Sequence, residues 1–305
     1  MTRPPPKNIA ASIRQRLLNK AKETGRPFSE LLQYFAMERL LYRLSKSRYA
    51  DNFVLKGALM LTVWEAPLTR PTMDIDLLGR IDNSIETIVE VTREICLQEV
   101  EPDGIDFDIA TIEAERIAED ADYEGIRVRF RGSLDTARIL MQLDIGFGDI
   151  VIPPPEPMRY PTLLDLPAPQ FRGYSKESTI AEKFEAMVKL GILNSRMKDF
   201  FDIWLMSRQF DFDGATLAEA ISKTFSTRGT SIQPKPIALT NSFAEDTAKA
   251  VQWRGFIRKN RLKNVPQNFA EVITAIAAFL TPIAEQLAAD RVFKATWKAS
   301  GTWLE

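Results

Sequence analysis

The segment Arg70-Pro71-Thr72-Met73-Asp74-Ile75-Asp76-Leu77 decides the fold of this 305-residue chain. From Met73 to Leu78 acidic and aliphatic residues alternate, and this period of two predicts a strand with one polar face. Residues two apart on a strand point to the same side, about 6.5–7 Å apart. Asp74 and Asp76 would therefore present two carboxylates to one point, where they could hold Mg²⁺ or Mn²⁺ together with substrate phosphates.

An Asp-x-Asp pattern by itself is also typical of any strand with a solvated face. The chain contains two further examples, Asp106-Phe107-Asp108 and Asp211-Phe212-Asp213, and neither has a functional context. We therefore base the interpretation of Asp74 and Asp76 on the residues that accompany them.

The first of these companions is Lys56-Gly57-Ala58, which follows a short apolar run and precedes helix-forming residues. It predicts a tight turn from strand to helix, where backbone N–H groups and a glycine allow a phosphate to approach closely. A glycine after a strand is often no more than a turn. Together with Arg70 and Thr72, however, it predicts a phosphate site beside the metal site.

A third carboxylate is expected in Leu143-Asp144-Ile145-Gly146, a strand that could run next to Asp76. Its apolar neighbours predict a buried strand, in which an unpaired aspartate would be costly. This burial favours a functional role for Asp144, with Asp149 as the alternative.

Composition excludes several other kinds of chemistry. The chain has no histidine and one cysteine, Cys96, so His-based catalysis, His-ligated zinc and disulfides are excluded. We expect no apolar run to approach the roughly 20 residues that span a bilayer, and the first residues do not form a signal peptide. We therefore expect a cytoplasmic protein without a membrane segment.

Hydrophobic periodicity predicts three segments and an α+β fold. Residues 1–50 are expected to form N-terminal helices. Residues 51–165 would form the α/β core, a mixed sheet of four or five strands with helices. A proline-rich connector leaves the sheet, and residues 166–305 are expected to form an all-α domain.

Four stretches, in this order, resemble the AbiEii/AbiGii-like nucleotidyltransferase toxins, a family that includes the MenT toxins. They are Leu55-Lys56-Gly57-Ala58, Arg70 to Leu77, Thr179-Ile180-Ala181-Glu182-Lys183-Phe184-Glu185-Ala186, and Arg196-Met197-Lys198-Asp199-Phe200-Phe201-Asp202-Ile203-Trp204. The chain departs from the family pattern at Ala58, where a second glycine or a serine is usual. Ala58 keeps the backbone N–H but offers no hydroxyl.

The resemblance implies a role for each matching residue. Asp74 and Asp76 would bind the metal, Gly57 would form the phosphate turn, Lys183 would neutralise the triphosphate, and Asp199 would complete the catalytic site. Arg196 could also contact phosphate. Asp144 would be a metal ligand or the base for the attacking hydroxyl, as a third carboxylate often is in the wider nucleotidyltransferase superfamily. Outside this context a Glu-Lys pair such as Glu182-Lys183 is most often a solvated helix face, and Asp202 could equally contact Lys198 or support the packing of Trp204.

The resemblance also implies an enzyme that transfers a nucleoside monophosphate from an NTP to an acceptor hydroxyl and releases pyrophosphate. It would be the toxin of a bacterial toxin–antitoxin pair, with the 3′ end of tRNA as acceptor and an AbiEi-like winged-helix protein as antitoxin. Basic segments from Asn8 to Arg26 and from Trp253 to Lys263 could bind RNA, or could be solvated helix faces. The alternatives are a protein or small-molecule acceptor, or a module that senses nucleotides without turnover.

Overall fold

The computed structural model describes residues 8–66, 70–120 and 123–305. The chain divides into two compact units, each described by itself below. Unit 1 contains residues 1–148 and 156–173, and unit 2 contains residues 149–155 and 174–305. The N-terminal helices pack with the sheet in unit 1, because nearly all of the second helix is buried there.

Unit 1 is built on a mixed sheet that contains seven strands within the described residues, in the order β3-β4-β5-β2-β1-β7-β6. Strands β3 to β5 form an antiparallel meander, and β2 is parallel to β5 and antiparallel to β1. The strand bounds are β1 Phe53–Lys56, β2 Ile75–Gly79, β3 Ile105–Asp120, β4 Tyr123–Leu134, β5 Ala137–Phe147, β6 Glu156–Arg159 and β7 Gln170–Gly173. The predicted α+β fold class with a mixed sheet is confirmed.

The proline-rich connector does not leave the sheet as expected, and this accounts for the larger number of strands. It supplies β6 and β7, and β7 pairs in parallel with β1. Pro157 lies in β6, at the edge of the sheet. A proline lacks an N–H donor and is tolerated at such an edge. The prediction that this proline-rich segment leaves the sheet is therefore wrong.

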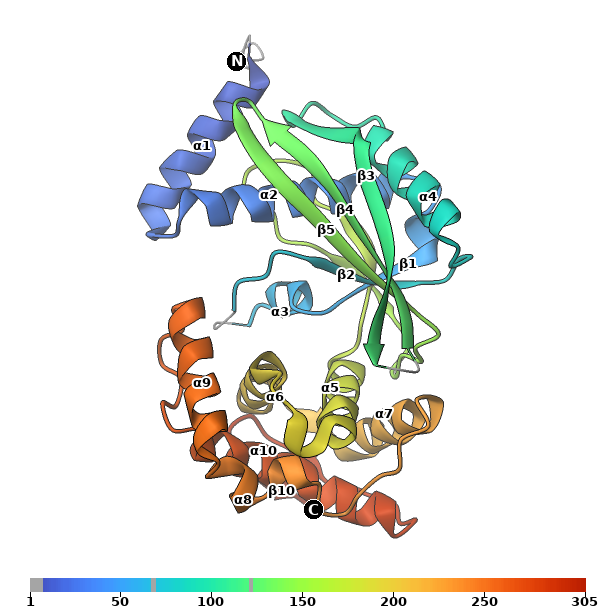
Figure 1. The fold of residues 1–305 in the computed structure, drawn as a ribbon, viewed down its shortest axis with the longest axis vertical. Helices are drawn as coiled ribbons and strands as arrows, with labels where there is room; N and C mark the ends of the chain where they lie inside the picture. The colour runs from blue at the N-terminus through green and yellow to red at the C-terminus, as the bar shows by residue number, and fades with distance from the viewer. Residues whose placement is uncertain (1–7, 67–69, 121–122) are drawn as a thin grey trace. The chain divides into compact units, whose positions relative to one another are not determined.

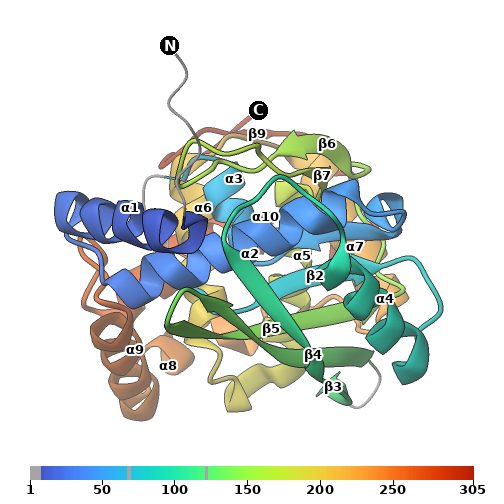
Figure 2. The same ribbon diagram turned by 90° about the horizontal axis from the view of Figure 1, so that it is seen from above.

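Helices α1 (Ile9–Thr24), α2 (Phe28–Lys46) and α4 (Ile85–Leu97) belong to unit 1, with the short α3 (Leu59–Val63) and the 3₁₀ turn η1 (Ala50–Asn52). Figures 1 and 2 show α2 running along the sheet. Every residue of α2 from Leu31 to Leu44 is buried, including charged ones. Arg43 donates to both carboxylate oxygens of Asp103, just ahead of β3, at 2.6 and 3.1 Å.

The α2 residue Glu38 forms a buried ion pair with Arg39 (2.7 Å) and accepts a hydrogen bond from the Leu163 N–H, also at 2.7 Å. Burial raises the pKa of Glu38 from 4.5 to about 7, against the lowering effect of these two partners. Between these values the folded protein holds a proton that the unfolded chain has lost. This group therefore favours folding most below its unfolded pKa, and stability falls as pH rises through the folded pKa.

We expect Glu38→Gln to flatten the fall in melting temperature between about pH 5 and pH 7.5. The glutamine side chain stays neutral, and its single amide oxygen can still accept from the Leu163 N–H, as Oε2 of Glu38 does, while the ion pair of Oε1 with Arg39 is lost. The measurement is thermal unfolding across this pH range, with Glu30→Gln, near the start of the same helix, as the control. An unchanged slope in Glu38→Gln would contradict the prediction.

Unit 2 consists mainly of helices, drawn from yellow to red in Figure 1. They are α5 Lys176–Leu190, α6 Met197–Gln209, α7 Gly214–Thr227, α8 Asn241–Ala244, α9 Thr247–Asn260 and α10 Phe269–Ala288, with the 3₁₀ turns η2 Gly191–Leu193 and η3 Ile237–Leu239. This half is not entirely helical, because β8 (Phe212–Asp213), β9 (Thr296–Trp297) and β10 (Trp303–Leu304) form a small sheet. Such two-residue strands leave no periodicity in the sequence.

Within the described residues, α10 alone is long and apolar enough to cross a membrane by length and composition. The expectation that no apolar run approaches this length is therefore wrong. Eight residues of α10 are buried inside unit 2, among them Phe279 and Leu280. Phe279 stacks on Trp303 and packs against Trp297. These contacts are those of a core helix.

Candidate active site

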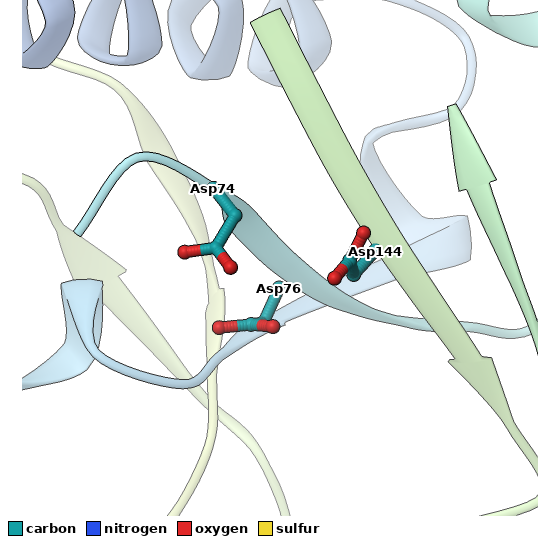
Figure 3. A group of neighbouring side chains, drawn as sticks. All are labelled: Asp74, Asp76 and Asp144. Carbon is teal, nitrogen blue, oxygen red and sulfur yellow. The ribbon is translucent and has the colours of Figure 1, made fainter. Parts of the chain in front are cut away.

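Three carboxylates meet on the sheet of unit 1 (Figure 3). Asp74, Asp76 and Asp144 each offer an oxygen atom, and these atoms lie within 4.8 Å of one another. Asp76 on β2 and Asp144 on β5 are direct neighbours in the parallel register of the two strands. Neighbouring residues of this kind project from the same face of a sheet, so the strand pairing itself brings the third carboxylate to the first two.

Asp74 lies just before β2 and not within it as predicted, because the strand starts at Ile75. The backbone just before β2 is held by side chains of α2, and not by pairing with a neighbouring strand. The Gln33 amide donates to the carbonyl of Met73 (3.3 Å), and the Thr72 N–H donates to the Tyr34 hydroxyl (3.2 Å). The Thr72 hydroxyl donates to Asp74. Thr72, predicted to contact phosphate, is buried here and orients Asp74.

Asp144 is paired with Arg127, a residue that the sequence analysis missed. The Arg127 Nε donates to Oδ1 at 2.8 Å, and Nη2 donates to Oδ2 at 2.6 Å. The two residues are partners in the antiparallel register of β4 and β5. The alternation Arg127, Arg129, Arg131 was a signal that these arginines share one face of a strand, but it could not show which strand would lie opposite.

Gly57 lies directly against the Asp76 carboxylate. Its φ angle is +73°, a conformation that favours glycine. A Cβ atom added at this position would lie 1.9 Å from Oδ2 of Asp76, far inside van der Waals contact. The glycine is therefore required for two reasons, the turn itself and the space occupied by the carboxylate.

The other residues of the predicted phosphate site surround this turn. Lys56 is the register partner of Asp76 across β1 and β2. Ala58 is buried and immediately precedes α3. Arg70 is half-buried, and it lies near enough to Tyr34 that its charge opposes the burial that raises the pKa of this phenol.

A small cavity of about 20 Å³ adjoins the carboxylates, lined by Lys56, Asp76, Ile117, Gly125, Asp144, Ile145 and Gly146. A volume of this size can hold about one water molecule or ion. The donor set fits a divalent cation, because Mg²⁺ and Mn²⁺ prefer carboxylate oxygens. Three carboxylates this close would also repel one another without positive charge nearby. Chemistry and spacing thus agree with a metal site.

The residues predicted to bind the triphosphate form a second cluster, in unit 2. The ammonium of Lys183 on α5 lies 2.9 Å from a carboxylate oxygen of Asp199 and 2.9 Å from one of Asp202, both on α6. Arg196 binds the other oxygen of Asp199 at 2.8 Å. Asp202 is therefore a buried partner of Lys183 and not an exposed residue of the helix face.

Electrostatics keep the buried Asp199 ionised. Burial alone would raise the pKa of this carboxyl, but the positive charges of Lys183 and Arg196 outweigh that effect and lower it below its ordinary range. The solvated helix face considered for Lys183 is wrong, because its side chain is only 14% exposed.

We expect Lys183→Ala to destabilise the protein by about 3 kcal/mol, because it leaves two buried carboxylates without their shared cation. Thermal or urea unfolding measures the effect. Lys198→Ala is the matched control, since Lys198 is exposed on the same α6 helix as the two aspartates. Equal stability of the two variants would contradict this assignment and leave Lys183 without a structural role.

Asp149, the alternative third carboxylate, lies in unit 2 and outside the aspartate cluster. Its Oδ1 atom accepts from Arg228 at 2.9 Å, and Arg228 also forms ion pairs with Glu182 (3.3 Å) and Glu185 (3.1 Å). Carboxylates surround this guanidinium and raise its pKa, although burial opposes them. Asp149 thus belongs to a buried ion network that joins residues 149–155 to α5.

The two further Asp-x-Asp patterns have ordinary structural roles. Asp106 and Asp108 are exposed on β3, away from the cluster. Asp213 caps α7 by accepting from the Thr216 N–H at 2.8 Å, and Asp211 pairs with Lys298 at 2.7 Å. The Asp-x-Asp pattern therefore occurs three times in the chain, and only the copy at Asp74 and Asp76 belongs to the candidate site.

Comparisons with known proteins agree with the geometry. The sequence profile of the family described as "Nucleotidyl transferase AbiEii toxin, Type IV TA system" matches residues 39–275. The match covers most of the chain, and the chain belongs to this family of nucleotidyltransferase toxins of type IV toxin–antitoxin systems. The resemblance seen in the sequence is confirmed.

Two crystal structures from Helicobacter pylori are also similar. One protein is described as a candidate nucleotidyltransferase, with a TM-score of 0.44, 13% identity, and coverage of 85% of this chain and 96% of that one. The other is JHP933, with a TM-score of 0.45, 15% identity, and coverage of 86% and 94%. No protein with a curated description matches significantly. Family membership therefore rests on the sequence profile.

Proposed function

We propose that this protein is a Mg²⁺- or Mn²⁺-dependent nucleotidyltransferase that transfers a nucleoside monophosphate from an NTP to an acceptor hydroxyl, the 3′ end of tRNA. One observation carries the proposal. Three carboxylates, two on neighbouring strands and one just before the first of them, converge beside a glycine turn in a chain of the AbiEii nucleotidyltransferase family. Carboxylates and a phosphate-compatible turn are what a metal–triphosphate complex requires.

In the proposed reaction, the acceptor oxygen forms a bond to the α-phosphorus and the bond to the bridging α–β oxygen breaks. Pyrophosphate leaves with that electron pair, and a carboxylate or water takes up the hydroxyl proton. A divalent ion held by Asp74 and Asp76, with Asp144 beside them, would supply positive charge for the phosphates. The protein needs mainly to position the reactants and to balance charge.

The residues of unit 1 have distinct parts in this proposal. Gly57 leaves room for the Asp76 carboxylate and for the approach of a phosphate to the backbone. Thr72 orients Asp74, and Lys56 offers an ammonium on the same row of the sheet as Asp76. Arg70 would contact phosphate, in keeping with its place in the family motif.

In unit 2, Lys183 and Arg196 would neutralise the triphosphate, and Asp199 would fix both of them in position. Support comes from their ion pairs with the buried Asp199 and from the family match, which spans all three residues. A lysine held between two carboxylates is also restricted in its motion, so less conformational entropy is lost when a phosphate binds.

Family membership supports the proposed antitoxin partner, whereas the tRNA acceptor is what the sequence resemblance implies. Membership in a type IV toxin family implies a cognate antitoxin, which we propose to be an AbiEi-like winged-helix protein. The basic residues on α1 and α9 would add to RNA binding through charge. Trp253 would not take part in base stacking, because it is fully buried and its indole N–H donates to the Pro266 carbonyl at 2.8 Å.

The direct test incubates the purified protein with total tRNA, Mg²⁺ and each α-labelled NTP in turn. We expect label on tRNA with one or more nucleotides, and none with Asp76→Ala. Label on protein or small molecules but not on RNA would overturn the tRNA acceptor while retaining the chemistry. If no NTP is consumed, or if Asp76→Ala still arrests growth on expression, the catalytic proposal fails.

A further inference from the structure

Five charged residues form one row across the sheet of unit 1. Glu115, Arg127, Asp144, Asp76 and Lys56 are successive register partners on β3, β4, β5, β2 and β1. Register partners project from the same face of a sheet, so the row brings these charges side by side. Asp144 and Asp76 are the two neighbours of like charge in this row. Arg127 lies on the other side of Asp144, and Lys56 lies on the other side of Asp76.

Within this row, the pairing of Arg127 with Asp144 has the geometry of a strong interaction. Two parallel N–H···O bonds of 2.8 and 2.6 Å join the guanidinium to both carboxylate oxygens. The Asp144 side chain is only 10% exposed, so water screens the pair little. Because a guanidinium stays protonated at any physiological pH, Asp144 has a permanent counter-charge even without a metal ion.

Asp74 has a different environment. It accepts a hydrogen bond from the hydroxyl of Thr72, which carries no charge, and it lies at the end of the cluster where no strand partner holds it. Asp76 lies between Asp74 and Asp144, against the backbone of Gly57. Arg127 also interacts electrostatically with Asp74, but both of its short hydrogen bonds go to Asp144. A divalent cation would therefore be attracted most strongly to the side of the cluster formed by Asp74 and Asp76.

The opposite side, between Asp76 and Asp144, has space for an ion but an unfavourable charge environment. The cavity of about 20 Å³ lies there, and its lining includes Lys56 as well as both aspartates. An ion there that used Asp144 as a ligand would meet the Arg127 guanidinium, which already binds both oxygens of that carboxylate. Repulsion between a divalent ion and a nearby monovalent cation is large in a partly buried site.

We propose that Arg127 is a positioning residue that takes the place of a second metal ion. It holds Asp144 against Asp76 and restricts the cluster of the NTP-free protein to a single divalent cation, bound by Asp74 and Asp76. The inference rests on the proposed function in one respect, that the aspartate cluster binds a divalent cation. Metal binding, rather than turnover, therefore provides its test.

The experiment is a titration of the NTP-free protein with Mn²⁺, in which electron paramagnetic resonance measures free ion. We expect one ion per wild-type chain and two per Arg127→Gln chain. Arg127→Lys, which keeps the positive charge, is expected to bind one ion. The double variant Arg127→Gln/Asp144→Asn should return to one ion, because the second site has lost a ligand.

Arg129→Gln is the matched control, since Arg129 lies on the same face of β4 but pairs with Glu115 and Gln142. It should bind one ion. Asp144→Asn provides an independent measurement if Arg127→Gln does not fold. With Arg127 intact, it should still bind one ion, with an affinity lowered by the uncompensated charge of Arg127. The double variant Arg127→Gln/Asp144→Asn lacks this charge and should recover the wild-type affinity to within about threefold, whereas loss of a true ligand would leave it at least about tenfold weaker.

Two ions in the wild type, one ion in Arg127→Gln, or a tenfold loss of affinity in Arg127→Gln/Asp144→Asn would each overturn the inference about Arg127. The failure of the underlying function has a different signature. If neither the wild type nor any variant binds Mn²⁺, the cluster is not a metal site, and the proposed function fails together with the inference.

Discussion

Asp76→Asn is expected to reduce nucleotidyl transfer by at least about 10³-fold, on the scale of losing a central electrostatic group of an active site. Asparagine keeps the shape of the side chain but removes its charge from the middle of the cluster, between Asp74 and Asp144. The measurement is the initial rate of label transfer from an α-labelled NTP, with Mn²⁺ binding as a second readout.

The same substitution should not unfold the protein. Removal of one of three close carboxylates relieves repulsion, so the melting temperature is expected to stay the same or to rise. Asp106→Asn is the matched control, because Asp106 begins an identical Asp-x-Asp pattern on an exposed strand position outside the cluster. Wild-type activity in Asp76→Asn, or equal losses in both variants, would refute the catalytic assignment.

Gly57→Ala is expected to have an effect on activity as large as that of Asp76→Asn, about 10³-fold. The added methyl group would clash with the Asp76 carboxylate, because its carbon atom would lie only 1.9 Å from Oδ2. Either the carboxylate or the turn must move, and both belong to the proposed site. A positive φ angle at an alanine costs about 1 kcal/mol in addition. Transfer assays and thermal unfolding together measure the two effects.

Gly25→Ala separates the backbone strain from the clash. Gly25 ends α1 with a φ angle of +69°, close to that of Gly57, but a Cβ atom there would meet nothing within 4 Å. We expect Gly25→Ala to lose about 1 kcal/mol of stability and to keep its activity. If the two alanine variants were equally active, Gly57 would be only a turn residue and not part of the site.

Local sequence patterns were sufficient for much of the site. Alternation around Asp76 predicted a strand with a polar face, and the glycine after an apolar run predicted the turn at Gly57. Both features depend on neighbouring residues along the chain, where φ preferences and side-chain periodicity act directly. The helical periodicity of α2 and α10 was equally clear in the sequence. Their burial was not, because α2 contains charged residues that turn out to be buried, and α10 is long and apolar but packs in a core.

Long-range pairing determined the remainder. Whether Asp144 or Asp149 joins Asp76 depends on which strand lies beside β2 and in which register, and a shift of one residue would turn Asp144 to the opposite face. The choice of Asp202 as partner of Lys183 depends likewise on the packing of α5 against α6. No local pattern specifies such contacts.

The sequence by itself thus indicated the family, the α+β class, the strand that carries Asp76 and the turn at Gly57, because these depend on periodicity, backbone freedom and motif order. The tertiary structure alone decided that Arg127 holds Asp144, that the proline-rich segment extends the sheet, and that Lys183 is buried between two carboxylates. These features arise from contacts between residues far apart in the chain, and the folded backbone alone sets those contacts.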